Sequence, residues 1–159
     1  MKILFLSVIA TTLAALTSCG SSIDLEAERQ SVQAINDEII DALENTRVEI
    51  LRKHMADDWE VFITPKTGWL RYNKEQFLKK FEEGFGPPGN VKYTVHDSQW
   101  LVTPMMALWK AHFTVDFGLL KAPVRRVPLL ATWIYEKRND NWYWVHAHES
   151  YAPVDTVKH

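Results

Sequence analysis

The stretch VPLLATWIYEKRNDNWYWVHAHESY, residues 127–151, decides the fold that this sequence predicts. Bulky apolar residues alternate with other residues on both sides of positions 139–141, the pattern of two strands joined by a tight turn. Two earlier segments, residues 91–102 and 107–117, have the same two-residue period. We therefore predict long antiparallel strands throughout the C-terminal half of the chain.

The half of the chain before these strands has helical periodicity. Apolar residues recur at three- and four-residue steps over residues 24–44, which predicts an amphipathic helix. Thr46 and Glu49 have the spacing of a capping box, so a second helix is expected to begin there. Asp57 and Asp58 are expected to end it, because short acidic side chains compete with helical hydrogen bonds.

Two short strands and a third helix complete the pattern. Residues 59–64 and 69–72 are rich in bulky side chains and flank a turn. Asn73 with Gln76 predicts the start of a helix, and Gly84 predicts its end. Three helices followed by antiparallel strands predict an α+β domain, with the helices on one face of a curved, mostly antiparallel sheet.

The N-terminus has the features of an export signal. Lys2 precedes a nearly uniform apolar run at residues 3–16, which is shorter than the about 20 residues that span a bilayer. Residues 16–19, LTSC, resemble the lipobox of bacterial lipoproteins. The resemblance implies that residues 1–18 are a signal peptide and that Cys19 carries lipid, which anchors the protein in the cell envelope. An ordinary signal peptide with a chance cysteine is the alternative.

The number of cysteines and the net charge exclude some covalent links and argue against some binding partners. The chain of 159 residues has one cysteine, so a disulfide within it is excluded. Its net charge of −2 argues against nucleic acid and against a polybasic contact with lipid headgroups. We expect a lipidated tether at residues 19–23, one domain at residues 24–152 and a tail at residues 153–159.

The order of several short motifs resembles one superfamily. The motifs are MADDW at residues 55–59, Gly68 in the hairpin, QFL at residues 76–78 and WYWVHAHES at residues 142–150. Their order is similar to that in members of the nuclear transport factor 2-like superfamily, which includes ketosteroid isomerase, scytalone dehydratase and the SnoaL-like proteins. The resemblance implies that the helices and the concave face of the sheet enclose a conical pocket.

Candidate catalytic residues lie on the last strand. By alternation, one face carries the following residues: Trp142, Trp144, His146, His148 and Ser150. We expect this face to line the pocket, because two tryptophans would otherwise lie in water. His148 or His146 then serves as a general acid or base, with Ser150 assisting. The alternative is that these side chains only complete the core.

The pocket is expected to have a tryptophan-rich wall. The candidate ligand-binding residues are the following: Trp59, Trp100, Trp133, Trp142 and Trp144. His146 and His148 could also hold a metal with His112, but no spacing fixes a third ligand, so no metal is predicted. No glycine-rich phosphate loop is present, and no cofactor is predicted.

The sequence departs from the ketosteroid isomerases. The resemblance would require an aspartate just before Pro65, where this chain has Thr64. It would also require a tyrosine in the first helix and an acid in the penultimate strand. Residues 24–54 contain no tyrosine and residues 127–135 no acid, so the isomerase triad is absent.

Three functions remain open. The first is binding of a small apolar or aromatic ligand in the pocket. The second is a cofactor-independent isomerase, dehydratase or hydrolase that uses His148 or His146. The third is an interaction module in which the convex face of the sheet, with Lys110, His112 and Asp116, forms a homodimer or binds another protein.

Overall fold

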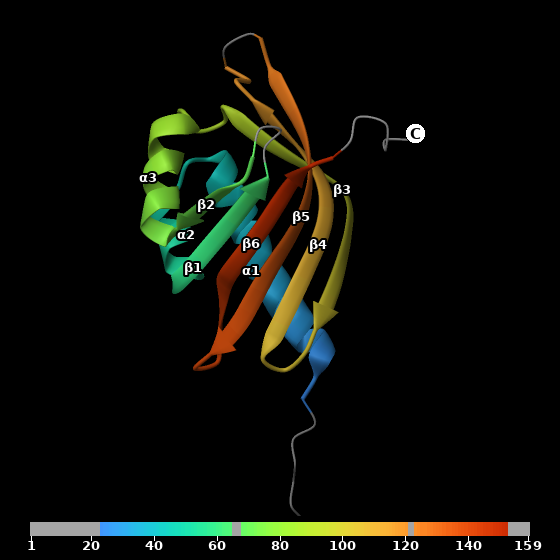
Figure 1. The fold of residues 1–159 in the computed structure, drawn as a ribbon. Coiled ribbons are helices and arrows are strands. Elements are labelled where there is room, and N and C mark those ends of the chain that lie inside the picture. The colour runs from blue at the N-terminus through green and yellow to red at the C-terminus, as the bar shows by residue number, and fades with distance from the viewer. Residues whose placement is uncertain (1–22, 65–67, 121–122, 153–159) are drawn as a thin grey trace, which may run out of the picture.

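Three helices cover one face of a curled six-stranded sheet (Figure 1). The computed structural model describes residues 23–64, 68–120 and 123–152. The helices are α1 (Leu25–Glu44), α2 (Val48–His54) and α3 (Lys74–Gly84). The strands are β1 (Met55–Thr64), β2 (Leu70–Asn73), β3 (Val91–Val102), β4 (Met106–Phe117), β5 (Arg125–Arg138) and β6 (Asn141–Tyr151).

The sheet has the order β2-β1-β6-β5-β4-β3. β1 and β6 are parallel, and every other neighbouring pair is antiparallel. The chain forms the β1–β2 hairpin, passes through α3 and then starts the long meander at the opposite edge. The predicted α+β class and the mostly antiparallel sheet are confirmed. Within the described residues, no helix is both long enough and apolar enough to cross a bilayer.

Polar caps fix where two of the helices begin. The Asp24 side chain accepts hydrogen bonds from the first turn of α1, and Asn73 forms the predicted capping box with Gln76 at α3. The predicted cap of α2 is wrong. Thr46 has a φ of 53°, and its hydroxyl donates to the Gly86 carbonyl at 2.9 Å. Arg47 is the residue before α2, without a capping hydrogen bond from its side chain.

The second helix ends earlier than predicted. α2 stops at His54, and Asp57 and Asp58 lie inside β1. Each aspartate is paired with a cation: Asp57 lies 3.1 Å from the Lys74 ammonium, and Asp58 binds Arg138 at 2.9 and 3.0 Å. These ion pairs, rather than a helix end, account for the two acidic residues.

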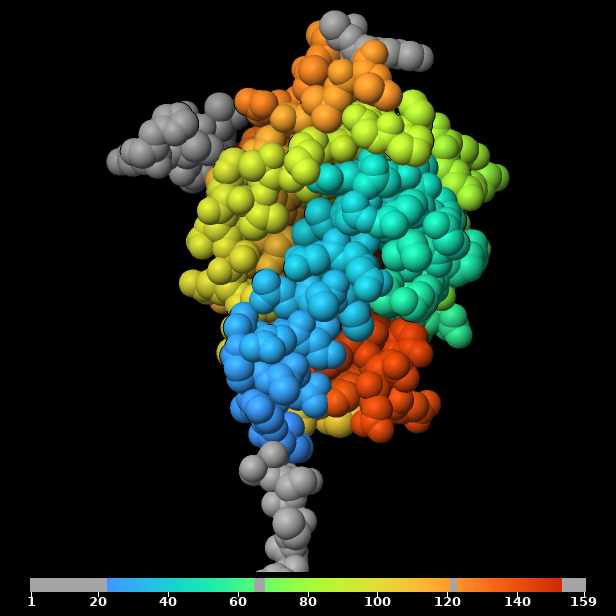
Figure 2. Space-filling view, turned by 180° about the vertical axis from the view of Figure 1, so that it is seen from behind, coloured from blue at the N-terminus to red at the C-terminus, as the bar shows by residue number. Residues whose placement is uncertain are grey.

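The sheet has a closed end and an open end. At the closed end, the first turn of α1 is joined to the β5–β6 hairpin, because Glu28 accepts hydrogen bonds from Lys137 and from the Trp142 indole. Figure 2 shows α1 crossing the molecule from this end, and its buried residues Ile39 and Leu43 belong to the core. At the opposite end the sheet curls away beneath α3, and a cavity lies between α3 and the sheet.

Candidate functional site

An extra residue in β6 decides which side chains face the interior. Tyr135 of β5 is opposite Trp144, but the preceding Ile134 is opposite His146, so Val145 is unpaired. Such a β-bulge shifts the alternation of side chains by one residue. Trp144 faces inward on one side of the bulge and Ala147 on the other, with exposed fractions of 2% and 0%.

The predicted inward orientation of His146, His148 and Ser150 is wrong. Strict alternation placed them with Trp144, whereas the bulge turns all three to the convex face. None of the three lines the cavity, and His148 is exposed. On this face the His146 ring lies 5.5 Å from the Phe62 ring, and its Nδ1 lies 3.8 Å from a carboxylate oxygen of Glu60. Burial lowers the pKa of His146, and Glu60 opposes this effect.

The third histidine considered for a metal site lies elsewhere. His112 is on β4, two strands away from β6, and its ring lies 5.0 Å from that of His96. Within the described segments, no three histidine, cysteine or acidic side chains are grouped so that they could hold a metal ion. Lys110, His112 and Asp116 alternate with the buried Ala111 and Phe113, so they lie on the convex face.

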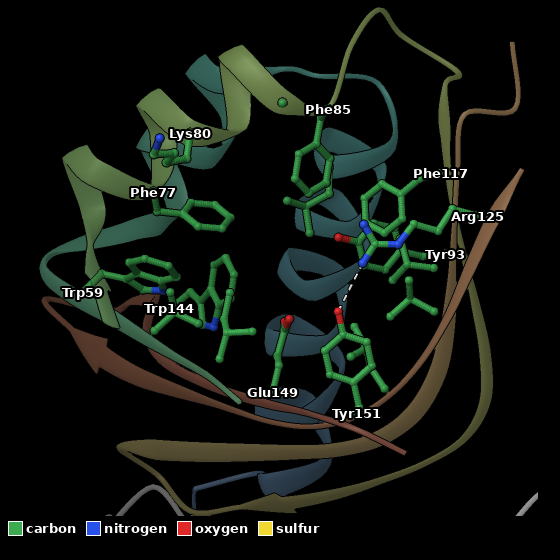
Figure 3. A pocket seen from close by; sticks show the side chains of 17 residues that line it. Trp59, Phe77, Lys80, Phe85, Tyr93, Phe117, Arg125, Trp144, Glu149 and Tyr151 are labelled. Carbon is green, nitrogen blue, oxygen red and sulfur yellow. Dashed lines mark hydrogen bonds between the residues drawn. The ribbon is translucent and has the colours of Figure 1, made fainter. Parts of the chain in front are cut away.

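A cavity of about 400 Å³ opens at the end of the sheet beneath α3 (Figure 3). This volume is within the range of small-molecule sites, about 300–1,000 Å³. Its walls come from the ends of β1, β4 and β6, the beginnings of β3 and β5, and the inner side of α3. The lining residues are Leu43, Trp59, Val61, Ile63, Phe77, Lys80, Gly84, Phe85, Tyr93, Val115, Phe117, Arg125, Val127, Leu129, Trp144, Glu149 and Tyr151.

One side of the cavity is an aromatic cluster of Trp59, Phe77 and Trp144. The Trp59 ring lies 4.9 Å from Phe77 and 5.0 Å from Trp144, in tilted and edge-to-face contacts. Thus two of the five predicted tryptophans line the cavity. The other three lie outside its lining: Trp100, Trp133 and Trp142.

Glu149 lies on the floor of the cavity and is the acid that the sequence analysis missed. Its Oε1 accepts a hydrogen bond from the Trp133 indole at 3.1 Å. Its burial among apolar side chains raises the pKa of Glu149 to about 7, partly opposed by the indole hydrogen bond. The carboxyl can therefore hold or release a proton near neutral pH, as a general acid or base requires.

Two phenols and one guanidinium lie across the cavity from the aromatic cluster. Burial raises the pKa of Tyr93 well above its usual value, and the negative charges of Glu149 and Glu44 add to this effect, so its hydroxyl stays protonated. Arg125 Nη2 donates to the Tyr151 hydroxyl at 3.3 Å. Figure 3 shows Glu149 between these groups and the aromatic cluster.

One signal in the sequence could have revealed Glu149. Trp142 and Trp144 are two residues apart, but the next small apolar residue, Ala147, follows after three. That step predicts a bulge, after which Glu149 and Tyr151 share the inward face. Arg125 and Tyr93 carried no such signal, because they meet Tyr151 and Glu149 only through the curl of the sheet.

The helices and the curled sheet form an α+β cone with a cavity at its open end, and this architecture defines the structural class of the protein. The model of the SnoaL-like domain matches residues 32–155, and the chain belongs to this family. A comparison with curated proteins finds no match.

Solved structures share the fold at low sequence identity. A proposed dehydratase of the NTF2-like family from Streptomyces avermitilis has a TM-score of 0.66 and 18% identity, covering 81% of this chain and 99% of its own. An NTF2-like protein from Cytophaga hutchinsonii has a TM-score of 0.67 and 13% identity, covering 79% of this chain and 98% of its own. A proposed Ca/calmodulin-dependent kinase II association domain from Exiguobacterium sibiricum has a TM-score of 0.67 and 13% identity, covering 83% of this chain and 98% of its own.

Proposed function

We propose that this protein is an exported lipoprotein, anchored through Cys19, whose SnoaL-like domain binds a small apolar or aromatic ligand. The cavity is the observation that supports ligand binding. It combines an aromatic cluster with a few polar groups whose hydrogen-bonding capacity is only partly used, the usual composition of a small-molecule site. The anchor is proposed from the lipobox-like residues 16–19, which lie outside the described residues.

The position of α1 is compatible with such an anchor. α1 begins at the end of the sheet where β5 turns into β6 (Figure 1), and Glu28 contacts Lys137 and Trp142 there. The cavity opens at the other end. Residues 19–24 span about 20 Å at most when extended. A lipid on Cys19 would therefore hold the closed end near the bilayer and leave the cavity accessible from the aqueous side. Metabolic labelling with a fatty acid, lost in Cys19→Ser, tests the anchor.

Thermal unfolding of the purified protein tests ligand binding. We would measure the unfolding temperature with a panel of small acids, sterols and aromatic metabolites. A ligand at about 100 times its dissociation constant stabilises the folded state by about 2.7 kcal/mol, which raises the unfolding temperature of a domain of this size by several degrees. If no compound shifts the transition, the binding proposal fails.

Gly84 offers a matched pair of variants for this experiment. Gly84 lines the cavity at the end of α3, and a Cβ added there meets no atom within 4 Å. Gly84→Trp should therefore narrow the cavity without disturbing the core and abolish the shift. Glu82→Trp adds the same side chain at an exposed position of the same helix that does not line the cavity, and should bind normally.

Glu149 supports a second function, proton transfer on the bound ligand. A desolvated carboxyl with a pKa of about 7 lies in the same cavity as the protonated Tyr93 hydroxyl. Such a pair can remove a proton and stabilise the oxyanion that results. This assignment replaces His148 and His146, which lie on the other face. The Streptomyces avermitilis neighbour is described as a proposed dehydratase, a reaction that also moves a proton.

Hydrogen–deuterium exchange at carbon tests proton transfer without knowledge of the natural substrate. An aryl ketone such as 1-tetralone would be incubated with the protein in D2O, and loss of its α-protons followed by NMR. We expect exchange that rises as pH passes through about 7 and disappears in Glu149→Gln. Exchange at the uncatalysed rate, with a bound ketone, would leave ligand binding as the function.

A further inference from the structure

Among the described residues, Arg125 is the one arginine with no carboxylate within 4.0 Å. Every other arginine lies within 4.0 Å of a carboxylate: Arg29, Arg47, Arg52, Arg71, Arg126 and Arg138. Within the described part of the chain, the one polar side-chain contact of Arg125 is the Tyr151 hydroxyl. Its neighbour Arg126 binds Asp116 at 2.8 and 2.9 Å. Adjacent arginines therefore differ, one paired internally and the other directed at the cavity.

The donors around Arg125 suit a carboxylate. A guanidinium has five N–H donors in a planar fork, and the contact with Tyr151 uses one of them. Because the Tyr151 oxygen accepts that bond, its own proton remains available to a ligand. A carboxylate can take two parallel hydrogen bonds from the fork and a third from the phenol.

The surroundings favour a single negative charge. Glu149 is an acid in the same cavity, and α3 ends at Gly84 on its wall, where the helix dipole is negative. Both features oppose a dianion such as a phosphate monoester, and within the described residues Lys80 is the one other cation in the lining. The remaining wall beyond Glu149 is the aromatic cluster of Trp59, Phe77 and Trp144.

We propose that the cavity takes a small monocarboxylic acid, with its carboxylate held by Arg125 and Tyr151 and its apolar or aromatic tail against Trp59, Phe77 and Trp144. This inference rests on the proposed ligand-binding function and specifies the class of ligand. The carboxylate lies at the Arg125 side of the cavity, and Glu149 faces the middle of the ligand. The tail fills the space between α3 and the sheet.

Two matched probes test the inference. 4-Phenylbutyrate and 4-phenylbutan-1-ol have the same tail and differ in the acid group. Binding to the purified protein would be measured by calorimetry at pH 6.5 and low salt. We expect the acid to bind at least about tenfold more tightly than the alcohol. Arg125→Gln should weaken the acid roughly 10- to 100-fold, as loss of a charged hydrogen bond does, and leave the alcohol unchanged.

The adjacent arginine provides the control. Arg126→Gln removes the same charge from the same strand but from the pair with Asp116, so it should leave the affinity for the acid unchanged. Tyr151→Phe should weaken the acid about fivefold, the effect of one neutral hydrogen bond. The unfolding temperature of each variant without ligand shows that the fold is retained.

The outcomes separate this inference from the proposed function. Equal affinity for acid and alcohol, or equal losses in Arg125→Gln and Arg126→Gln, would overturn the carboxylate assignment and leave ligand binding intact. Tighter binding of 4-phenylbutyl phosphate than of the carboxylate would overturn it as well. If neither the acid nor the alcohol binds, and the wider panel of ligands also fails, both proposals are wrong.

Discussion

The two ends of the sheet contain the same kinds of side chains in different states. At the closed end, the Tyr135 hydroxyl donates to Asn36 at 2.7 Å and the Trp142 indole donates to Glu28 at 3.1 Å. At the open end, no hydrogen bond of the Tyr93 hydroxyl lies within the described residues, and Glu149 accepts one bond from Trp133. At the closed end, these two polar side chains have partners within the protein. The open end has a cavity and unused hydrogen-bonding capacity.

This difference distinguishes a site from a core. Aromatic residues lie at both ends, so their presence alone does not locate the site. Buried polar groups normally find partners within the protein, and an exception calls for a specific explanation. The Trp59 indole N–H, in the cavity wall, is one of the buried polar groups without a hydrogen-bond partner among the described residues. Tyr93, Arg125 and Glu149 line the same cavity, where a ligand would supply hydrogen-bond partners.

Among our predictions, the ionisation of Glu149 should cause the largest change in the free energy of unfolding. Its pKa is about 7 in the folded state and 4.5 as the reference value for the unfolded chain. Between these values the folded state binds more protons, so this group lowers stability as pH rises from 4.5 to 7. Above pH 7 the full cost remains, up to about 3 kcal/mol. Glu149→Gln should therefore be more stable than the wild type at pH 8 and nearly equal at pH 4.5.

Urea unfolding at several pH values measures this difference. The wild-type curve alone is composite, because His146 has a lowered pKa and the paired carboxyls Glu28, Glu38, Asp58 and Asp116 have lowered pKa values. These groups add stability as pH rises, with His146 acting just below pH 6.5 and the carboxyls at lower pH. Subtracting the two curves isolates Glu149. A difference that stays constant between pH 5 and 8 would contradict the assignment of a desolvated acid.

A tyrosine-to-phenylalanine substitution, made once at each end, should give the next largest change in the free energy of unfolding. Tyr135→Phe removes a buried hydroxyl and leaves the buried Asn36 without this donor, which should cost about 1–3 kcal/mol. Tyr93→Phe removes a hydroxyl that faces the cavity, and its stability should change by no more than about 0.5 kcal/mol. Urea unfolding at pH 7 compares the two directly. Equal losses would mean that the Tyr93 hydroxyl also has a structural partner.

The periodicity of the apolar residues and the helix-capping residues predicted nearly all of the fold. The alternation in residues 127–151 and the Asn73–Gln76 capping box are local signals, and both elements form where they were predicted. The end of α2 was predicted incorrectly, because Asp57 and Asp58 lie in β1, where Lys74 and Arg138, distant in the sequence, pair with them. Local propensity contains no information about such distant partners.

The site was predicted less well than the fold. Trp59 and Trp144 were expected in the cavity wall and do line it. The strict two-residue period placed His148 in the cavity, whereas the bulge at Val145 places the neighbouring Glu149 there. Arg125 and Tyr93 lie on separate strands, and only the curl of the sheet brings them into one cavity with Glu149. A pattern along the chain cannot report that curvature.

His148→Ala should give the smallest effect and tests the two faces of β6. His148 and Glu149 are neighbours in sequence, but His148 is exposed on the convex face and Glu149 lies in the cavity. We expect His148→Ala to change stability by less than about 0.5 kcal/mol and to leave the affinity for 4-phenylbutyrate unchanged. Glu149→Gln should instead raise that affinity at pH 8, because it removes a negative charge from the cavity. Loss of binding in His148→Ala would mean that the ligand lies on the convex face, and the cavity would no longer be the site.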